Sequence, residues 1–157
     1  MAIDEVYLQR AIALAQAGVD RGDGGPFGAV IVKDGRIVGE GCNRVVHDRD
    51  ATAHAEIVAI RAASKTLGHF HLTGCVLYAS SEPCPMCLSA AYWAHLARVV
   101  FANTRQEAAA LGFCDNDLYA QLRLPHGERT IPTVHHPLAG ASEPLRRWQA
   151  NPRHVHY

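Results

Sequence analysis

The chain has 157 residues, of which 48% are hydrophobic and 19% are charged, a composition typical of one globular domain rather than a disordered chain. Fifteen Lys and Arg residues balance fifteen Asp and Glu residues, so the chain lacks the basic charge with which proteins bind nucleic acid. No apolar run reaches the ~18–20 residues that cross a bilayer, and Asp4 and Glu5 stand where a secretory signal would be cationic. Because five cysteines are an odd count in a chain that needs no disulfides, we expect a cytoplasmic protein.

The first third of the chain predicts a helix followed by a β-hairpin. Residues 4–17 have the apolar spacing of an amphipathic helix. A glycine-rich loop at residues 22–26 leads to two short apolar segments, 29–33 and 36–41. Asp34 and Gly35 separate these segments, and Asp-Gly between two strands favours a tight hairpin turn.

The rest of the chain predicts alternating strands and helices. Helices are expected at residues 52–65, 85–96, 105–111 and 141–149, and strands at residues 75–79, 98–102 and 130–135. Short strands that are apolar on both faces, between helices, indicate a parallel sheet covered on both sides. We therefore expect a single α/β domain over residues 1–157, with a mixed five-stranded sheet between helical layers. The helix at 85–96 contains no charged residue, so we expect it to be interior.

Two cysteines form the first half of a candidate metal site. Pro85 suits the first turn of a helix, which places Cys84 and Cys87 on one face of its N-terminus. Helix N-termini stabilise thiolates, and two thiolates three residues apart are a good half-site for zinc. The pair alone is also compatible with a redox dithiol or with half of a structural zinc site.

His54 and Glu56 supply the second half. His54 is the natural third ligand, and Glu56 lies at the buried start of its helix, where a carboxylate needs a partner. Three protein ligands leave the fourth zinc position to water, so the site is of the catalytic type. Glu56 is then the general base, and one zinc per chain is expected. The combination H-x-E followed by P-C-x-x-C resembles the signature of zinc nucleobase deaminases.

The sequence resembles the cytidine deaminase superfamily, and within it the small bacterial guanine deaminases. The resemblance is based on residues 52–56 and 82–88, and it continues through residues 91–94, 111–115, 128–132 and Tyr157. It implies a three-layer α/β/α sandwich, a homodimer with the C-terminal segment 137–157 exchanged between subunits, and conversion of guanine to xanthine and ammonia. A small purine, and neither nucleic acid nor a membrane, is the implied partner.

The resemblance also assigns residues to the substrate. Asn43 is expected to hydrogen-bond the purine, Asp115 to read or protonate it, and Tyr157 to close the pocket, while Phe27 and Trp93 supply apolar or stacking surface. The family tends to have two consecutive aspartates after Gly-Phe, whereas this chain has Cys114-Asp115-Asn116-Asp117. Either Asp115 or Asp117 could therefore be the carboxylate that recognises the purine.

Three other functions compete with this one. A tRNA adenosine deaminase shares the zinc motif but needs a basic surface, and a deaminase of cytosine or another heterocycle fits the same motif. A zinc-binding module without turnover predicts four protein ligands. A redox protein predicts a disulfide between Cys84 and Cys87 and no metal.

Overall fold

The computed structural model describes residues 4–157, with the backbone only at Asn116. It divides into two compact units, one that ends at Asp115 and one that comprises Asn116–Tyr157. The expected single domain, and the exchange of segment 137–157, stay predictions.

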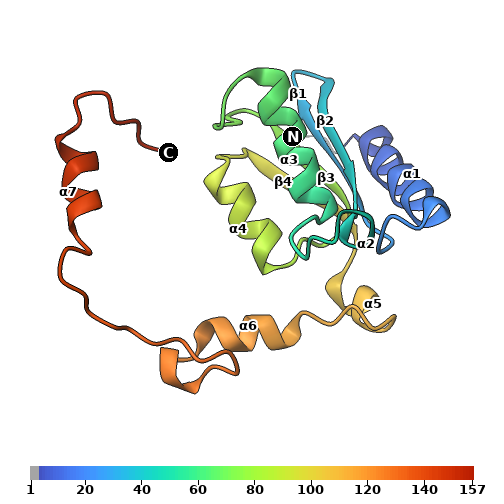
Figure 1. Cartoon of the computed structure of the whole chain (residues 1–157). Coiled ribbons are helices and arrows are strands. Elements are labelled where there is room, and N and C mark those ends of the chain that lie inside the picture. Colours follow the sequence, from blue (N-terminus) through green and yellow to red (C-terminus); the bar gives the residue numbers. More distant parts are fainter. Residues whose placement is uncertain (1–3) are drawn as a thin grey trace. The chain divides into compact units, whose positions relative to one another are not determined.

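A four-stranded mixed sheet forms the centre of the first unit (Figure 1). Its strands are β1 (Gly28–Lys33), β2 (Arg36–Cys42), β3 (Val76–Ser81) and β4 (Arg98–Asn103), in the order β2-β1-β3-β4. β1 pairs antiparallel with β2 and β3, while β3 and β4 are parallel. Asp34 and Gly35 have φ angles of 48° and 74°, as a tight hairpin turn requires. The expected hairpin and the mixed sheet are thus confirmed.

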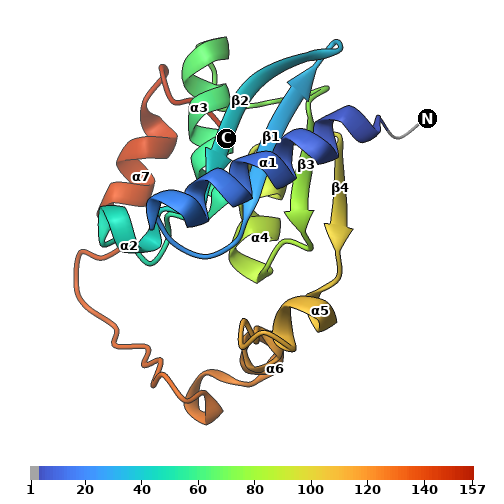
Figure 2. The same ribbon diagram turned by 90° about the vertical axis from the view of Figure 1, so that its right-hand side faces the viewer.

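Helices cover both faces of this sheet, as the two views show (Figures 1 and 2). α1 (Glu5–Arg21) lies on one face, and α3 (Ala55–Leu67) and α4 (Pro85–Trp93) lie on the other. The alternation of side chains along the strands divides the core in the same way. Val30 and Tyr78 belong to the cluster on the α1 side, whereas Ile31 and Leu77 pack with the alanines of α3. This confirms the sandwich of helices and sheet.

Two glycines let α3 lie directly on β2. A Cβ at Gly39 would be 2.4 Å from the Ala59 carbonyl oxygen, and a Cβ at Gly41 would be 2.5 Å from the Ala55 carbonyl oxygen. Only glycine permits so close an approach of strand and helix backbones. The N-terminus of α3 is therefore held against the end of β2.

Three features of the first unit differ from the expectations. α4 is not interior: Tyr92 and Trp93 are 77% and 65% exposed, and only Pro85, Cys87 and Ala91 are buried. The lack of charge along α4 therefore reflects an apolar exposed face rather than complete burial. The sequence pattern also missed the four-residue helix α2 (Val45–Asp48), and it predicted α5 (Arg105–Ala109) about two residues too long.

The second unit contains α6 (Asn116–Arg123), a 3-10 turn (His126–Glu128) and α7 (Glu143–Ala150). The expected fifth strand at residues 130–135 is wrong, because this part of the described chain forms no strand. Pro132 lacks the N–H that a strand ladder uses, and Ile131 and Val134 are 79% and 82% exposed. Among the described residues, no helix combines the length and apolar character of a membrane span.

Candidate metal centre and active site

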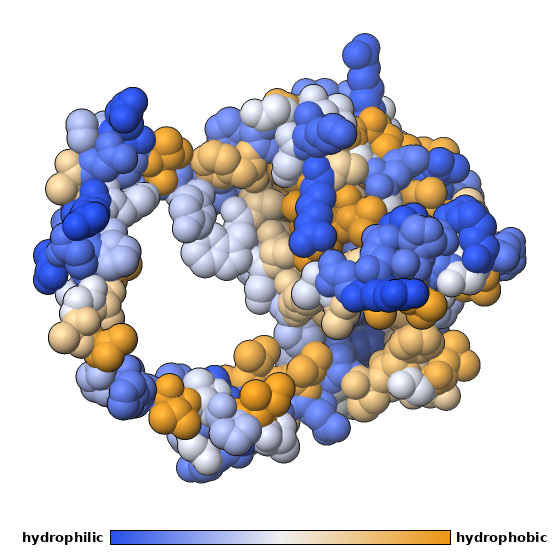
Figure 3. All heavy atoms as spheres, viewed as in Figure 1, coloured by the Kyte–Doolittle hydropathy of each residue, from blue (hydrophilic) through white to orange (hydrophobic). Residues whose placement is uncertain are grey.

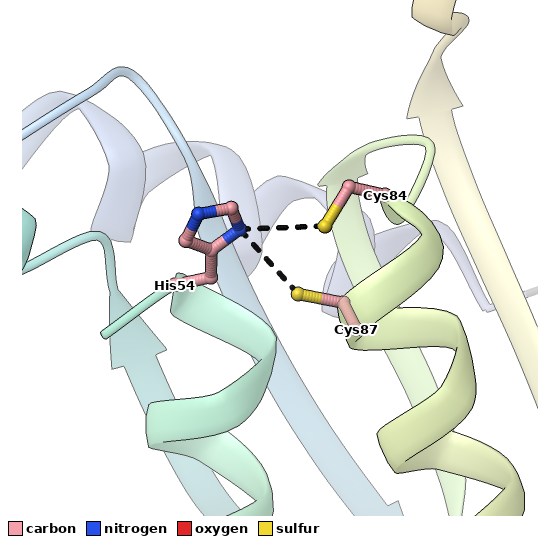
Figure 4. Close-up of side chains that lie close together, drawn as sticks. All are labelled: His54, Cys84 and Cys87. Carbon is pink, nitrogen blue, oxygen red and sulfur yellow. Dashed lines mark hydrogen bonds between the residues drawn. The ribbon is translucent and has the colours of Figure 1, made fainter. Parts of the chain in front are cut away.

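Two helices begin at the same place and bring the predicted metal ligands together. His54 is the N-cap residue of α3, and Cys84 is the N-cap residue of α4, with Pro85 at the first helical position. Neither side chain caps its own helix, so both are available to a ligand. Figure 4 shows His54, Cys84 and Cys87 pointing toward one another from the starts of these helices.

The spacing of these three side chains fits a tetrahedral zinc ion. The Nδ1 atom of His54 lies 3.5 Å from the sulfur of Cys84 and 3.5 Å from the sulfur of Cys87. Tetrahedral zinc with its usual bonds to nitrogen and sulfur separates these atoms by about 3.6 Å. Among the described residues, this is the one group of three or more His, Cys, Asp or Glu whose ligand atoms all lie within 4.8 Å of one another. The three residues are therefore positioned to bind one metal ion.

Glu56 lies beside this group on the first turn of α3. Glu56 is only 7% exposed, and its Oε2 atom lies 3.4 Å from the sulfur of Cys87. Burial raises the pKa of the Glu56 carboxyl above its usual value. Glu56 therefore binds a proton more readily than an exposed glutamate does.

The two cysteines have opposite protonation tendencies before a metal binds. The Cys87 thiol and then His54 donate hydrogen bonds to Cys84, which lowers the pKa of Cys84 to about 4. The same pairing, with Cys87 as the donor, raises the pKa of Cys87. Hydrogen bonding to Cys84 also raises the pKa of His54. Cys84 is thus a thiolate before a metal binds, and the thiolate is the form of cysteine that binds zinc.

Asn43 follows β2 and is held by backbone contacts on both sides. Its Oδ1 atom accepts hydrogen bonds from the N–H groups of Gly25, at 3.1 Å, and Val45, at 3.2 Å. The side chain is 5% exposed, and its amide nitrogen donates no hydrogen bond to any residue that the structure describes. The nitrogen is thus the part of Asn43 that can donate a hydrogen bond to a bound molecule.

Phe27 and Asp115 are the other predicted substrate residues in the first unit with clear contacts. The Phe27 ring packs edge-on against Phe113, with ring centroids 4.9 Å apart. Asp115 is half-buried, and burial, followed by the negative charge of Cys84, raises the pKa of its carboxyl. Asp115 therefore belongs to the electrostatic surroundings of the metal ligands.

The remaining predicted residues do not lie beside the metal ligands in the structure of the first unit. Trp93 is the last residue of α4, about 13 Å along the helix axis from Cys84. Asp117 is an exposed residue in the first turn of α6, and Tyr157 is 71% exposed; both belong to the second unit. Their roles stay predictions.

Phe113 was not among the site residues predicted from the sequence. Its ring lines a pocket of about 200 Å³ together with Phe27, and none of the three metal ligands lines this pocket. The signal for Phe113 in the sequence was its place in the Gly112-Phe113 pair of the resemblance, two positions before Asp115. Nothing in the local pattern ties Phe113 to Phe27.

Comparisons with known proteins agree with this geometry. The family model for the cytidine and deoxycytidylate deaminase zinc-binding region matches residues 1–103. Guanine deaminase of Bacillus subtilis (strain 168) is 50% identical over 145 residues, which cover 92% of this chain and 93% of that protein. The X-ray structure of guanine deaminase from Bacillus subtilis matches with a TM-score of 0.96 at 47% identity and covers 99% of each chain.

The tRNA-specific adenosine deaminase of Bacillus subtilis (strain 168) is also similar, but less so. It is 39% identical over 134 residues, which cover 85% of this chain and 82% of that protein. The zinc motif, its geometry and these matches lead to one conclusion. The chain belongs to the zinc-binding cytidine and deoxycytidylate deaminase family.

Proposed function

We propose that this protein is a zinc-dependent hydrolase that deaminates guanine to xanthine and ammonia. The observation that carries the proposal is the meeting of His54, Cys84 and Cys87 beside the buried carboxyl of Glu56. Guanine is favoured as the substrate because the similarity to guanine deaminase extends over almost the whole chain. When bound to the three ligands, zinc supplies a nucleophile by lowering the pKa of water to about 7.

Glu56 moves the protons of the reaction. Its carboxylate takes a proton from the attacking water and passes it to a ring nitrogen of guanine. It then takes the proton of the newly added hydroxyl group and gives it to the amine, which leaves as ammonia while the carbonyl of xanthine forms. Burial favours the protonated form of Glu56, which makes its carboxylate a stronger proton acceptor than an exposed one. Water is added and ammonia leaves, and Glu56 ends the cycle as it began.

The residues around the metal ligands hold the purine. Asn43 donates from its amide nitrogen to an acceptor atom of the base, because its oxygen is already bonded to Gly25 and Val45. Phe27 supplies an apolar wall, and Asp115 reads or protonates the ring, with Asp117 as the alternative reader. Trp93, at the end of α4, and Tyr157, in the second unit, complete the pocket. In the proposed homodimer, a second copy of the chain can supply Tyr157.

The functional unit is a homodimer in which the segment 137–157 is exchanged between subunits. This proposal is supported by the apolar side chains on the surface of the second unit, some of which are visible in Figure 3. Leu138 is 71% exposed and Leu145 is 72% exposed. Apolar side chains exposed to this extent usually mark an interaction surface. The cytoplasm is the proposed location, since all five cysteines are free thiols, as in a reducing compartment.

Ammonia release tests the function directly. The zinc-loaded protein is incubated separately with guanine, adenine, cytosine and cytidine, and ammonia is measured. We expect release from guanine, loss of activity and zinc in Cys84→Ser, and neither loss in Cys114→Ser, whose cysteine is exposed and outside the ligand group. Release from adenine or cytosine but not from guanine would overturn the substrate assignment.

A further inference from the structure

The ring of Phe27 is held from one side by a residue far away in the sequence. Phe27 and Phe113 meet with an interplanar angle of 86° and a centroid distance of 4.9 Å. After α5, the chain folds back on itself, since the N–H of Phe113 donates to the Ala108 carbonyl oxygen at 3.2 Å. Edge-on aromatic pairs of this kind are attractive and have a defined geometry.

Gly25 lies beside the same two rings and leaves them space that a side chain at this position would take. A Cβ at Gly25 would lie 3.0 Å from Cε2 of Phe27 and 3.3 Å from Cε1 of Phe113. The N–H of Gly25 donates to Oδ1 of Asn43, and the N–H of Asn43 donates to the Phe27 carbonyl oxygen at 2.9 Å. The proposed purine donor and the aromatic pair are thus parts of one connected structure.

Empty space lies next to this pair. The pocket of about 200 Å³ is lined by both rings and by Pro26, Ser81, Asn103 and Leu111, among others. Side chains next to unfilled volume lose the packing contacts that fix their orientation. Without Phe113, Phe27 would have room to rotate into this space.

We propose that Phe113 is a positioning residue that fixes the ring of Phe27 as the apolar wall of the purine site. It acts through Phe27 and Gly25 rather than on the purine itself. The proposal rests on the proposed function, because it assigns the wall to a purine substrate. We expect Phe113 to affect KM rather than kcat, because an apolar wall contacts the base equally in the bound state and in the transition state.

Kinetics of single variants give the first test. We expect Phe113→Ala to raise KM for guanine roughly 2- to 10-fold, the size of an aromatic pair interaction, with kcat changed by less than about 2-fold. Phe113→Tyr keeps the ring and should restore the wild-type KM. Phe70→Ala is the matched control, because Phe70 and Phe113 are both 44% exposed; it should leave KM unchanged.

A double-mutant cycle separates positioning from a general loss of stability. In a Phe27→Leu background, Phe113→Ala should change KM no further, because the ring that it positions is absent. An equal increase of KM in both backgrounds would overturn the proposal. So would an unchanged KM in Phe113→Ala.

The orientation of Phe27 gives a readout that does not depend on the substrate. In crystals of the zinc-loaded protein, we expect one ordered Phe27 ring in the wild type and a rotated or disordered ring in Phe113→Ala. An unmoved ring in the variant would contradict the positioning role even if guanine were not the substrate. A wild type without guanine turnover but with a displaced ring in the variant would refute only the proposed function.

Discussion

The two units of this protein differ in how far their apolar side chains are buried. In the first unit, Ile31, Leu72 and Leu77 are completely buried between the sheet and its helices. In the second unit, Ile131 and Val134 are about four-fifths exposed, and no described residue is classed as buried. The first unit therefore stabilises its own fold and the metal ligands, whereas the second unit leaves its apolar side chains exposed.

Loss of the carboxyl group of Glu56 should have the largest effect, and it tests whether the first unit contains the chemistry. We expect Glu56→Gln to lower kcat by a factor of about 10²–10⁴ or more, since the proton carrier is removed, while the zinc content stays unchanged. Ammonia release and elemental analysis measure the two quantities. Glu5→Gln on the exposed start of α1 is the control and should leave both unchanged. Substantial activity in Glu56→Gln would contradict the assigned role.

A pair of leucine truncations compares the two units directly. Leu77→Ala should lower the free energy of unfolding by about 2–5 kcal/mol, because it opens a cavity at a fully buried position. Leu138→Ala should change the unfolding of the first unit by less than about 0.5 kcal/mol and weaken dimerisation instead. Urea unfolding and analytical ultracentrifugation measure these changes. Equal losses of stability in both variants would show that the comparison is wrong.

A pair of glycine substitutions tests how α3 is held. Gly41→Ala should lower the free energy of unfolding by about 1–3 kcal/mol, since its Cβ would be 2.5 Å from the Ala55 carbonyl oxygen. Because α3 begins beside His54, zinc affinity should fall as well. Gly127→Ala in the second unit is the control, with nothing within 4 Å of its Cβ. Calorimetric unfolding and zinc titration of both variants measure these two effects. Unchanged zinc affinity in Gly41→Ala would contradict the link between α3 and the metal ligands.

Removal of the ion pair between Arg10 and Glu40 should have the smallest effect on the free energy of unfolding. Two hydrogen bonds of 2.7 Å and 2.8 Å from Arg10 lower the pKa of the Glu40 carboxyl in the folded state. A lowered pKa stabilises the fold above the unfolded value of about 4.3, and this contribution disappears as the pH falls through the folded pKa. Glu40→Gln should therefore cost at most about 1 kcal/mol at pH 7 and nothing near pH 2.

The measurement is urea unfolding of wild type and Glu40→Gln across that pH range. Glu143→Gln removes an ion-paired carboxylate from the second unit and serves as the control. It should leave the unfolding of the first unit unchanged at every pH. A difference between wild type and Glu40→Gln that grows toward acid would have the wrong sign.

Much of the first unit could be predicted from local sequence. The Asp34-Gly35 turn and the apolar runs of β3 and β4 are strong local signals, and the structure has these elements within two residues of the expected bounds. The metal ligands were predictable for the same reason, because Cys84 and Cys87 are spaced by one helical turn. Such signals need no knowledge of distant contacts.

The failures have a common physical origin. Residues 130–135 contain enough β-branched and apolar residues to predict a strand, but Pro132 removes a ladder donor and no described strand pairs with them. The contact between Phe27 and Phe113 joins residues 86 positions apart, so no periodicity shows it. The apolar surface of α4 predicted burial, although sequence cannot tell an interior helix from one whose apolar face is exposed.

X-ray absorption at the zinc edge of the purified wild-type protein tests the central claim most directly. One zinc per chain is predicted, with two sulfur neighbours at about 2.3 Å and the remaining neighbours, nitrogen and oxygen, at about 2.0–2.2 Å. Three or four sulfur neighbours, or freshly purified protein without zinc, would contradict the assignment of His54, Cys84 and Cys87 as the ligands of a catalytic ion.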